Sequence, residues 1–172
     1  AIMLIAKVLD WKDILSEKGA WDAMFWMGGL VALATALAKS GFIAWIAKLI
    51  GTAVAAANMG WIASFVLISL IYIYSHYCFA SVTARISAMY AAFVAVAAAC
   101  GVPAMLVAIT FGCFANLPIS LTHYGNGCGP VYFGAGYVSQ GEWWRNGFII
   151  TTINVVIWLT IGMAWWKFIG LY

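Results

Sequence analysis

Three side chains able to carry positive charge lie in otherwise apolar sequence: His76, Arg85 and His123. A charge at the centre of a membrane helix costs about 2.5–3.5 kcal/mol on insertion scales, so such a residue usually faces a partner or a water-filled cavity. No Asp or Glu occurs between positions 23 and 141. Any partner of Arg85 within this stretch is therefore an uncharged group or a bound anion. The alternative is an Arg85 side chain that extends to the lipid headgroups.

Short polar side chains suited to an anion lie near these cations in the sequence, namely Ser81, Thr83, Ser87, Thr122 and Asn126. Hydroxyl and amide donors, together with the free N–H groups at helix N-termini, bind carboxylates, and arginine can do so through two parallel hydrogen bonds. The alternative for a serine or threonine is a hydrogen bond to its own helix, and for His76 a structural role.

Nothing in the sequence indicates catalysis, a metal site or a nucleic-acid partner. Paired carboxylates in apolar sequence, a Ser/His/Asp set and a phosphate-binding loop are absent, and the net charge is only +3. The four cysteines lie far apart without a CxxC pair and are interpreted as small apolar residues in helices. We therefore expect no catalytic residue, no metal ligand and no cofactor.

The composition excludes a soluble domain. Hydrophobic residues make up 66% of the chain and charged residues 8%, whereas soluble domains carry roughly 25% charged residues. Aromatic residues make up 16%, which is typical of proteins with two lipid–water interfaces. The chain begins with Ala1 rather than a methionine or a signal peptide, and we interpret it as a fragment.

Apolar stretches separated by polar or glycine-containing junctions predict an all-α polytopic membrane protein with a single transmembrane unit over residues 1–172. The predicted parts are residues 1–60, the first helices with an interfacial segment; residues 61–99, a re-entrant hairpin; residues 104–138, a broken helix; and residues 148–172, the last span.

Within the first part, residues 10–22 hold four of the five acids and predict an interfacial helix or loop. Residues 23–38 predict a membrane helix, ended by Lys39-Ser40-Gly41. Residues 42–57 form a second apolar stretch, which is short for a perpendicular span of about 20 residues and favours a position along the membrane surface.

Residues 61–99 admit two interpretations. Apolar residues 61–74 and 88–99 flank the more polar 75–87, so the segment is either two spanning helices with a surface loop or a re-entrant hairpin whose tip stops near mid-membrane. Each arm is nearer half a membrane than a whole one, which favours the hairpin.

Residues 122–130 interrupt the apolar run that starts at position 104. One proline and five glycines between positions 125 and 136 cannot sustain an uninterrupted helix, and the segment has no charged side chain, unlike an ordinary external loop. We therefore favour a broken transmembrane helix, a device with which secondary transporters build binding sites. Residues 139–147 predict an interfacial elbow before the last span.

The stretch Phe79-Ala80-Ser81-Val82-Thr83-Ala84-Arg85-Ile86-Ser87-Ala88-Met89-Tyr90, followed by Leu121-Thr122-His123-Tyr124-Gly125-Asn126-Gly127 and Phe133-Gly134-Ala135-Gly136-Tyr137, resembles the divalent anion:sodium symporter (DASS) family. It is most similar to the branch of citrate, malate and 2-oxoglutarate carriers. The resemblance implies that this chain is the C-terminal inverted repeat of a longer carrier, and that the N-terminal repeat is missing from the sequence. It also implies a homodimer in a membrane, which we expect to be the bacterial inner membrane.

In that family a Ser-Asn-Thr triplet at each hairpin tip holds the substrate carboxylates, and it corresponds here to Ser81, Val82 and Thr83. Val82 has no side-chain oxygen for the sodium ion of the symporters. Exchangers of the family replace sodium with fixed positive side chains, and the resemblance assigns this role to Arg85 and His123. The remaining substrate-binding residues that it implies are Thr122, Gly125, Asn126 and Gly127.

The sequence thus predicts a secondary transporter that exchanges di- or tricarboxylates, with Arg85 and His123 offsetting the substrate charge. A fixed positive charge cannot cross a membrane cheaply without its anion, so exchange is expected to be obligatory. The alternatives are a sodium-coupled dicarboxylate symporter, in which Na⁺ is bound mainly by backbone carbonyls, and a non-transporting membrane scaffold or assembly half.

Overall fold

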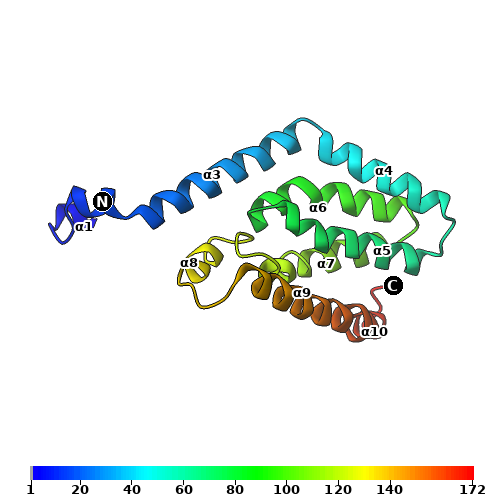
Figure 1. Cartoon of the computed structure of the whole chain (residues 1–172). Helices are drawn as coiled ribbons and strands as arrows, with labels where there is room; N and C mark the ends of the chain where they lie inside the picture. The colour runs from blue at the N-terminus through cyan, green and yellow to red at the C-terminus, as the bar shows by residue number, and fades with distance from the viewer. Residues whose placement is uncertain (1) are drawn as a thin grey trace.

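The computed structural model describes the backbone of residues 2–172, and the side chains of all but some positions within the first 38 residues. The described chain is helical throughout and contains no strand. In order, the elements are α1 (Ile2–Ile5), α2 (Trp11–Ser16), α3 (Lys18–Lys39), α4 (Phe42–Ala56), α5 (Trp61–Tyr74), the 3-10 turn η1 (Ser75–Cys78), α6 (Val82–Ala99), α7 (Ala104–Cys113), the 3-10 turn η2 (Leu117–Ser120), α8 (Gly129–Gly134), α9 (Gln140–Ile157), the π-helical η3 (Trp158–Gly162) and α10 (Met163–Phe168) (Figure 1). The predicted all-α architecture is confirmed.

The junctions between the early helices lie where the sequence predicts them. Gly41 has φ of 77° and separates α3 from α4, and Gly101 has φ of 82° between α6 and α7. Glycine adopts this left-handed backbone without the steric cost of a Cβ atom, so each glycine ends one helix and redirects the chain. The 15 residues of α4 make it too short for a perpendicular span, as predicted.

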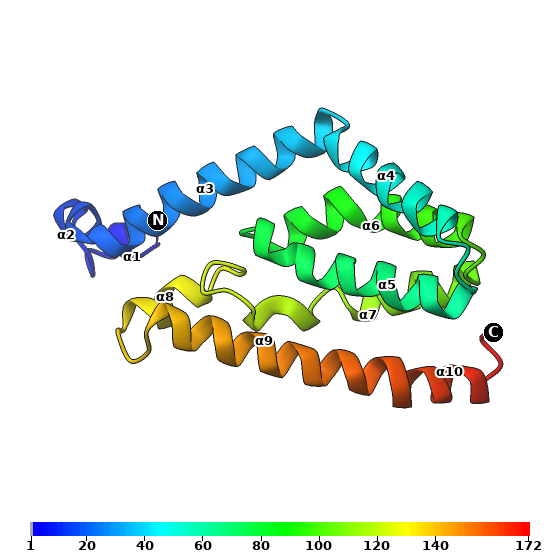
Figure 2. The same ribbon diagram turned by 45° about the vertical axis from the view of Figure 1, so that its right-hand side comes forward.

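Helices α5 and α6 form a hairpin and lie side by side, with α4 on one side and α7 and α9 on the other (Figure 2). The turn between them consists of η1 and residues 79–81. The rest of the polar stretch 75–87, residues 82–87, already belongs to α6. At 1.5 Å per residue the 14 residues of α5 extend about 21 Å, against a hydrocarbon core of about 30 Å. Both interpretations of residues 61–99 contain this pair of helices, so the choice of a re-entrant hairpin stays a prediction.

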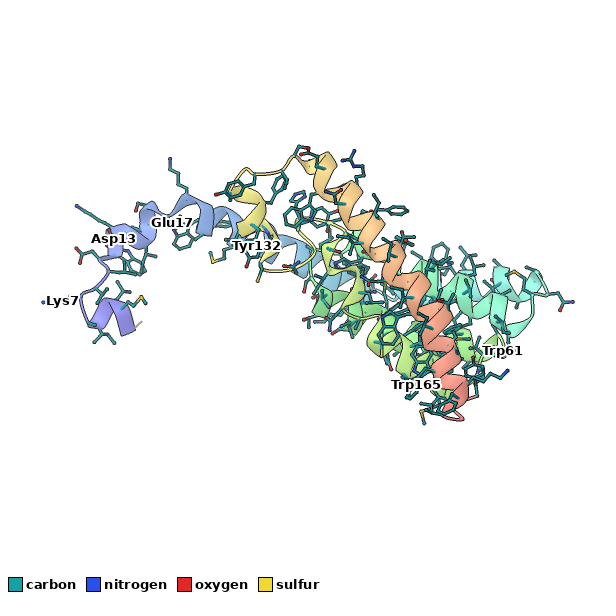
Figure 3. The ribbon with its side chains drawn as sticks, turned by 90° about the horizontal axis from the view of Figure 1, so that it is seen from below. Lys7, Asp13, Glu17, Trp61, Tyr132 and Trp165 are labelled. Carbon is teal, nitrogen blue, oxygen red and sulfur yellow. The ribbon has the colours of Figure 1, made fainter. Side chains whose placement is uncertain are left out.

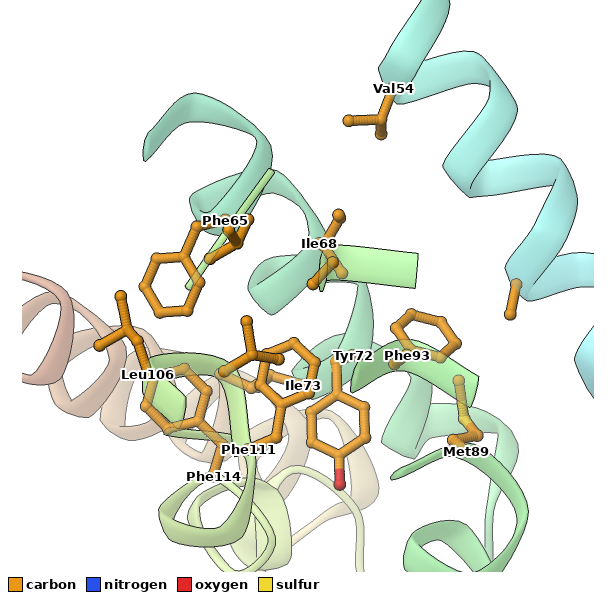
Figure 4. Packing of buried hydrophobic residues seen from close by; sticks show 14 of the residues in the cluster. Val54, Phe65, Ile68, Tyr72, Ile73, Met89, Phe93, Leu106, Phe111 and Phe114 are labelled. Carbon is orange, nitrogen blue, oxygen red and sulfur yellow. The ribbon is translucent and has the colours of Figure 1, made fainter. Parts of the chain in front are cut away.

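The core of the molecule lies between α5, α6 and α7. Helix α5 is apolar on nearly all sides in sequence, as expected for a helix surrounded by others. Tyr72 lies at the centre, with its ring stacked on Phe111 at 4.6 Å between centroids and tilted against Phe93 at 5.7 Å (Figure 4). The other large side chains of this cluster are Phe65, Ile68, Ile73, Met89, Leu106 and Phe114. These contacts hold the hairpin against α7 and so fix where its turn lies.

Two predicted boundaries are wrong. Residues 139–147 do not form an elbow, because α9 begins at Gln140. Ser139 and Glu142 form a capping box, in which the Ser139 hydroxyl accepts from Glu142 N and the carboxylate accepts from Ser139 N at 2.9 Å. This Ser-x-x-Glu pattern predicts a helix start at Ser139, whereas the two tryptophans that follow it indicate an interfacial elbow. Similarly, α3 begins at Lys18, ahead of the predicted helix start at residue 23.

Three described helical segments are long and apolar enough to cross a membrane: Trp61–Cys78, Val82–Ala99 and Gln140–Phe168. Charged Lys7, Asp13 and Glu17 lie at one end of the molecule, and Trp61 and Trp165 lie toward the opposite end (Figure 3). Trp165 is exposed and stacks on Phe168, an arrangement typical of an aromatic belt at a lipid–water interface.

The close approach of α9 to η2 depends on Gly147. A Cβ atom at this position would collide with the carbonyl oxygen of Ser120 and would lie 3.0 Å from Leu121 Cα. Both are backbone atoms, which cannot make room by a change of rotamer as a side chain can. Small residues allow this kind of backbone contact between membrane helices.

We therefore expect Gly147→Ala to destabilise the protein by about 1–3 kcal/mol through overpacking. Gly141→Ala on the same helix is the matched control, since nothing lies within 4 Å of the added carbon. Thermal unfolding in detergent, followed by size-exclusion chromatography, measures both variants. Equal melting temperatures for the two variants would contradict the packing of α9 on η2.

Candidate functional site

The turn of the hairpin and the interruption after α7 lie against each other. We call residues 75–81 the tip and residues 121–128 the break; in Figure 2 the break is the yellow-green loop before α8. Tyr124 Oη donates to the carbonyl oxygen of Tyr77 at 2.8 Å. Gly125 is buried directly against His76. The two segments that the sequence predicted as halves of one site are therefore adjacent.

Arg85 is fully buried one turn into α6 and does not extend to the surface. Its Nη1 donates to the carbonyl oxygen of Tyr72 at 3.0 Å. Its Nη2 donates to the carbonyl oxygens of Phe114 at 3.3 Å and Ala115 at 2.6 Å. The guanidinium carbon also lies 4.6 Å from the centre of the Tyr72 ring, in cation–π geometry. Of the alternatives left by the sequence, the structure shows an uncharged partner.

These carbonyls belong to helix ends. Tyr72 lies in the last turn of α5, and Phe114 and Ala115 follow the last residue of α7. Carbonyls at a helix C-terminus lack intrahelical donors and carry the negative end of the helix dipole, so a guanidinium is well placed there. The dipoles stabilise the positive charge, yet they do not cancel it, because no carboxylate is present between positions 23 and 141.

The predicted triplet Ser81, Val82 and Thr83 lies at the N-terminus of α6. Ser81 is the N-cap, and its hydroxyl accepts from Ala84 N at 3.4 Å. Thr83 is exposed on the first turn, whereas Val82 is half-buried and offers no side-chain oxygen. The helix of 18 residues thus presents its positive dipole end and the Thr83 hydroxyl at the tip.

Asn126 holds the break together from within. Its Oδ1 accepts from the backbone N–H groups of Cys128 and Gly129, both at 2.8 Å, and its Nδ2 donates to the carbonyl oxygen of Ile119 at 3.2 Å. The side chain thus joins η2 to the start of α8 across the break. In this structure Asn126 shapes the site, and most of its hydrogen-bonding capacity is used within the chain. Its predicted contact with substrate stays a prediction.

His123 is half-buried within an aromatic group. Its ring stacks on Phe133 at 4.3 Å between centroids, and its Nδ1 accepts from Trp144 Nε1 at 3.3 Å. A nitrogen that accepts a hydrogen bond carries no proton, so the ring in this geometry is neutral with its proton on Nε2. The predicted positive charge on His123 therefore requires this hydrogen bond to break, and stays a prediction.

The other predicted residues of the break differ in accessibility. Thr122 is fully buried and its hydroxyl has no hydrogen-bond partner among the described residues. Gly125 is buried, while Gly127 is exposed. The tip and the break meet through Tyr77, His76, Tyr124 and Gly125, whereas Arg85 bonds to carbonyls outside both segments. Among the predicted residues, Thr83 and Gly127 are exposed, and Arg85 and Thr122 are fully buried. That all nine contact one substrate stays a prediction.

Sequence reasoning missed how central His76 and Tyr72 are. Tyr72 supports the Arg85 guanidinium with both its ring and its carbonyl, and His76 lies against Gly125. The available signal was the spacing of Ser69, Tyr72 and His76, which on a continuous helix would place three polar residues on one face; in the structure the first two lie on α5 and His76 lies in η1. Of the cysteines, Cys78 is the last residue of the 3-10 helix η1, whereas Cys128 precedes α8 as its N-cap, so the assignment of Cys128 to a helix is wrong. Both are exposed.

Within the described residues no group of His, Cys, Asp or Glu is arranged to hold a metal ion. A cation at this junction would have to rely on backbone carbonyls and hydroxyls, which are the oxygen ligands that hard cations prefer. At the base of the tip, the Phe114 and Ala115 carbonyls are already engaged by Arg85.

Comparison with known proteins matches all 172 residues to the family model described as Sodium:sulfate symporter transmembrane region. The chain is 44% identical to Dicarboxylate transporter 1, chloroplastic, of Spinacia oleracea and 42% identical to the protein of the same name in Arabidopsis thaliana, over its whole length. It is 45% identical to a Bacillus subtilis protein named Putative malate transporter YflS. It covers 30%, 31% and 36% of these proteins, so the chain spans about a third of the length of the curated relatives it matches.

The bonds of Asn126 generate a prediction about stability. Asn126→Ala removes three hydrogen bonds and leaves backbone groups near the break unpaired, which should destabilise the protein by on the order of 2 kcal/mol. Asn116→Ala is the control, because Asn116 is exposed and its side chain does not cap η2. Melting temperatures in detergent should fall for the first variant and stay within error for the second. The reverse order would contradict the role of Asn126.

Proposed function

Because the chain belongs to the sodium:sulfate symporter transmembrane family, we propose that the protein carrying it exchanges one di- or tricarboxylate for another across a membrane. The family is one of transporters, not enzymes, and the chain is part of an integral membrane protein. The names of the relatives, which describe transporters of dicarboxylates and of malate, support a carboxylate substrate. The bacterial inner membrane is the location that we propose.

The observation that carries the proposal is the buried Arg85, held between the last turn of α5 and the residues that follow α7 without a carboxylate. Arg85 lies two residues after Thr83 on α6, so the exposed Thr83 and the buried Arg85 leave the helix on nearly opposite sides. A substrate carboxylate at this surface gains from three sources: the Thr83 hydroxyl, the N-terminal dipole of α6, and the Arg85 charge behind it. Arg85 acts here through its field, since both of its terminal nitrogens are engaged by carbonyls.

A fixed charge explains why exchange would be obligatory. Moving an uncompensated guanidinium through a medium of low dielectric constant is costly, and a bound anion reduces that cost. The loaded carrier can therefore change its orientation while the empty one cannot. A sodium ion would behave differently because it leaves with the substrate, which lets an empty symporter return.

The sodium-coupled alternative rests on the backbone of the same junction. Val82 replaces the amide that would contribute a side-chain oxygen, so any Na⁺ would depend on carbonyls and hydroxyls of the tip and break. The engagement of Phe114 and Ala115 by Arg85 favours exchange over this alternative. We further propose that an inverted repeat outside this chain supplies the opposite wall of the site, and that the protein is a homodimer.

Counterflow measurements test the proposal. The natural protein carrying this sequence, reconstituted in liposomes, should take up labelled malate only into vesicles preloaded with a dicarboxylate, at equal rates with and without sodium. Uptake into empty vesicles driven by a sodium gradient would establish the symporter instead. Absence of uptake in both conditions, from protein that remains folded, would favour the non-transporting scaffold.

Substitution of Arg85 tests the role of the fixed charge. Arg85→Gln should reduce malate exchange at least tenfold, since it removes the charge and the donors to three carbonyls. Arg85→Lys keeps the charge without the planar fork and should retain part of the activity. Lys48→Gln, which removes an exposed positive charge from α4, is the control and should exchange normally. Unchanged exchange in Arg85→Gln would exclude the assigned role.

A further inference from the structure

His76 is a buried imidazole that the proposed exchange does not use. It lies in the tip, its side chain is fully buried, and no side chain among the described residues bonds to either ring nitrogen, with the Gly125 backbone beside it. Buried polar groups are almost always paired, so an unpaired one calls for an explanation. His123 provides a contrast within the same site, because its Nδ1 is engaged by Trp144.

The unpaired groups of His76 and Thr122 converge on one point in the break. A Cβ atom built on Gly125 would lie 2.5 Å from His76 Nε2 and 2.9 Å from Thr122 Oγ1. Both side chains are fully buried and both lack partners in the described part of the chain. Gly125 permits this approach, since any side chain would occupy the space next to the imidazole. Two orphaned polar groups from two segments thus meet beside the proposed carboxylate site.

The charge around His76 is positive. The titratable or charged groups on the elements that pack around it are Tyr72 and Tyr74 on α5, Arg85 and Tyr90 on α6, Tyr77 and Cys78 in the tip, His123, Tyr124 and Cys128 in the break, and Glu142 and Arg145 on α9, which contacts the tip through Trp144. Glu142 is the single carboxylate of this set, and it is exposed and bonded to Ser139. An imidazole buried beside Arg85, away from carboxylates, is therefore neutral when no anion is bound.

A bound dicarboxylate reverses this balance. Arg85 is the one fixed charge that the described residues of this chain contribute there, so the two negative charges of a dicarboxylate exceed it by one unit at a site of low dielectric constant, which is unfavourable. An additional proton at the junction brings the sum to zero. The opposite charge of the substrate also favours the imidazolium form of a nearby histidine.

We infer that His76 is a proton-binding site that fills when a dicarboxylate binds, so that one proton enters the loaded site with the substrate. The inference rests on the exchange function proposed above. The proton comes from bulk water, one N–H bond forms on the imidazole, and the same bond breaks when the substrate leaves. Binding and protonation are then linked, and each strengthens the other to the same extent.

The unmodified protein provides the first test. L-malate binding to the natural protein in detergent is measured by calorimetry in phosphate and in Tris between about pH 7 and pH 8, where free carboxylic acids are ionised. The difference in binding enthalpy between the buffers should correspond to uptake of about one proton per malate, and the Kd should rise about tenfold per pH unit. Equal enthalpies and a Kd independent of pH would overturn the inference.

A substitution at His76 then locates the proton. His76→Gln should abolish proton uptake and the pH dependence of the Kd, while Lys48→Gln, which removes an exposed charge from α4, should retain both. Loss of uptake in His123→Gln alone would place the proton on His123 and overturn the assignment to His76. Counterflow of the unmodified protein separates the two proposals, since exchange without proton uptake rejects this inference alone, and absence of exchange rejects the proposed function.

Discussion

The arrangement of this chain depends on one interaction: a guanidinium without a carboxylate, bound to the carbonyl ends of two helices. Arg85 joins the last turn of α5 to the residues that follow α7, so it connects the hairpin with the interrupted helix at their point of contact. The interaction adds hydrogen bonds to carbonyls at helix ends, of which that of Tyr72 also accepts from Ser75 Oγ at 2.7 Å. It also leaves a positive charge behind the surface where the hairpin turns, and the proposed carboxylate site depends on that charge.

The residues discussed for the site fall into an exposed group and a buried group. Thr83 and the start of α6 are accessible, whereas Arg85, Thr122 and His76 lie beneath and support them. Asn126 and Gly125 determine the course of the break, the first by bonding across it and the second by having no side chain. Recognition and support therefore come from different residues of the same short motifs, which a list of motif positions does not distinguish.

The helices were largely predictable because their causes are local. Apolar runs bounded by Gly41, Asn58 and Gly101 placed α4, α5 and the end of α6 within a residue or two of their actual bounds. The start of α9 was not predicted. Ser139 and Glu142 have the spacing of a capping box, but the tryptophans next to them favoured an interfacial elbow. Such boundaries are decided by single hydrogen bonds at helix ends, which composition does not reveal.

The sequence by itself determined that the protein is helical and embedded in a membrane, and that Arg85 has no acidic partner nearby, since charge content, apolar run length and the positions of carboxylates need no coordinates. Only the tertiary structure decided which uncharged groups Arg85 meets, and that the imidazole of His76 lies against Gly125. These contacts join residues 13 to 49 positions apart, and they depend on how three helices pack around Tyr72. Packing of this kind is set by the fit of side chains between helices, which the order of residues along one helix does not specify.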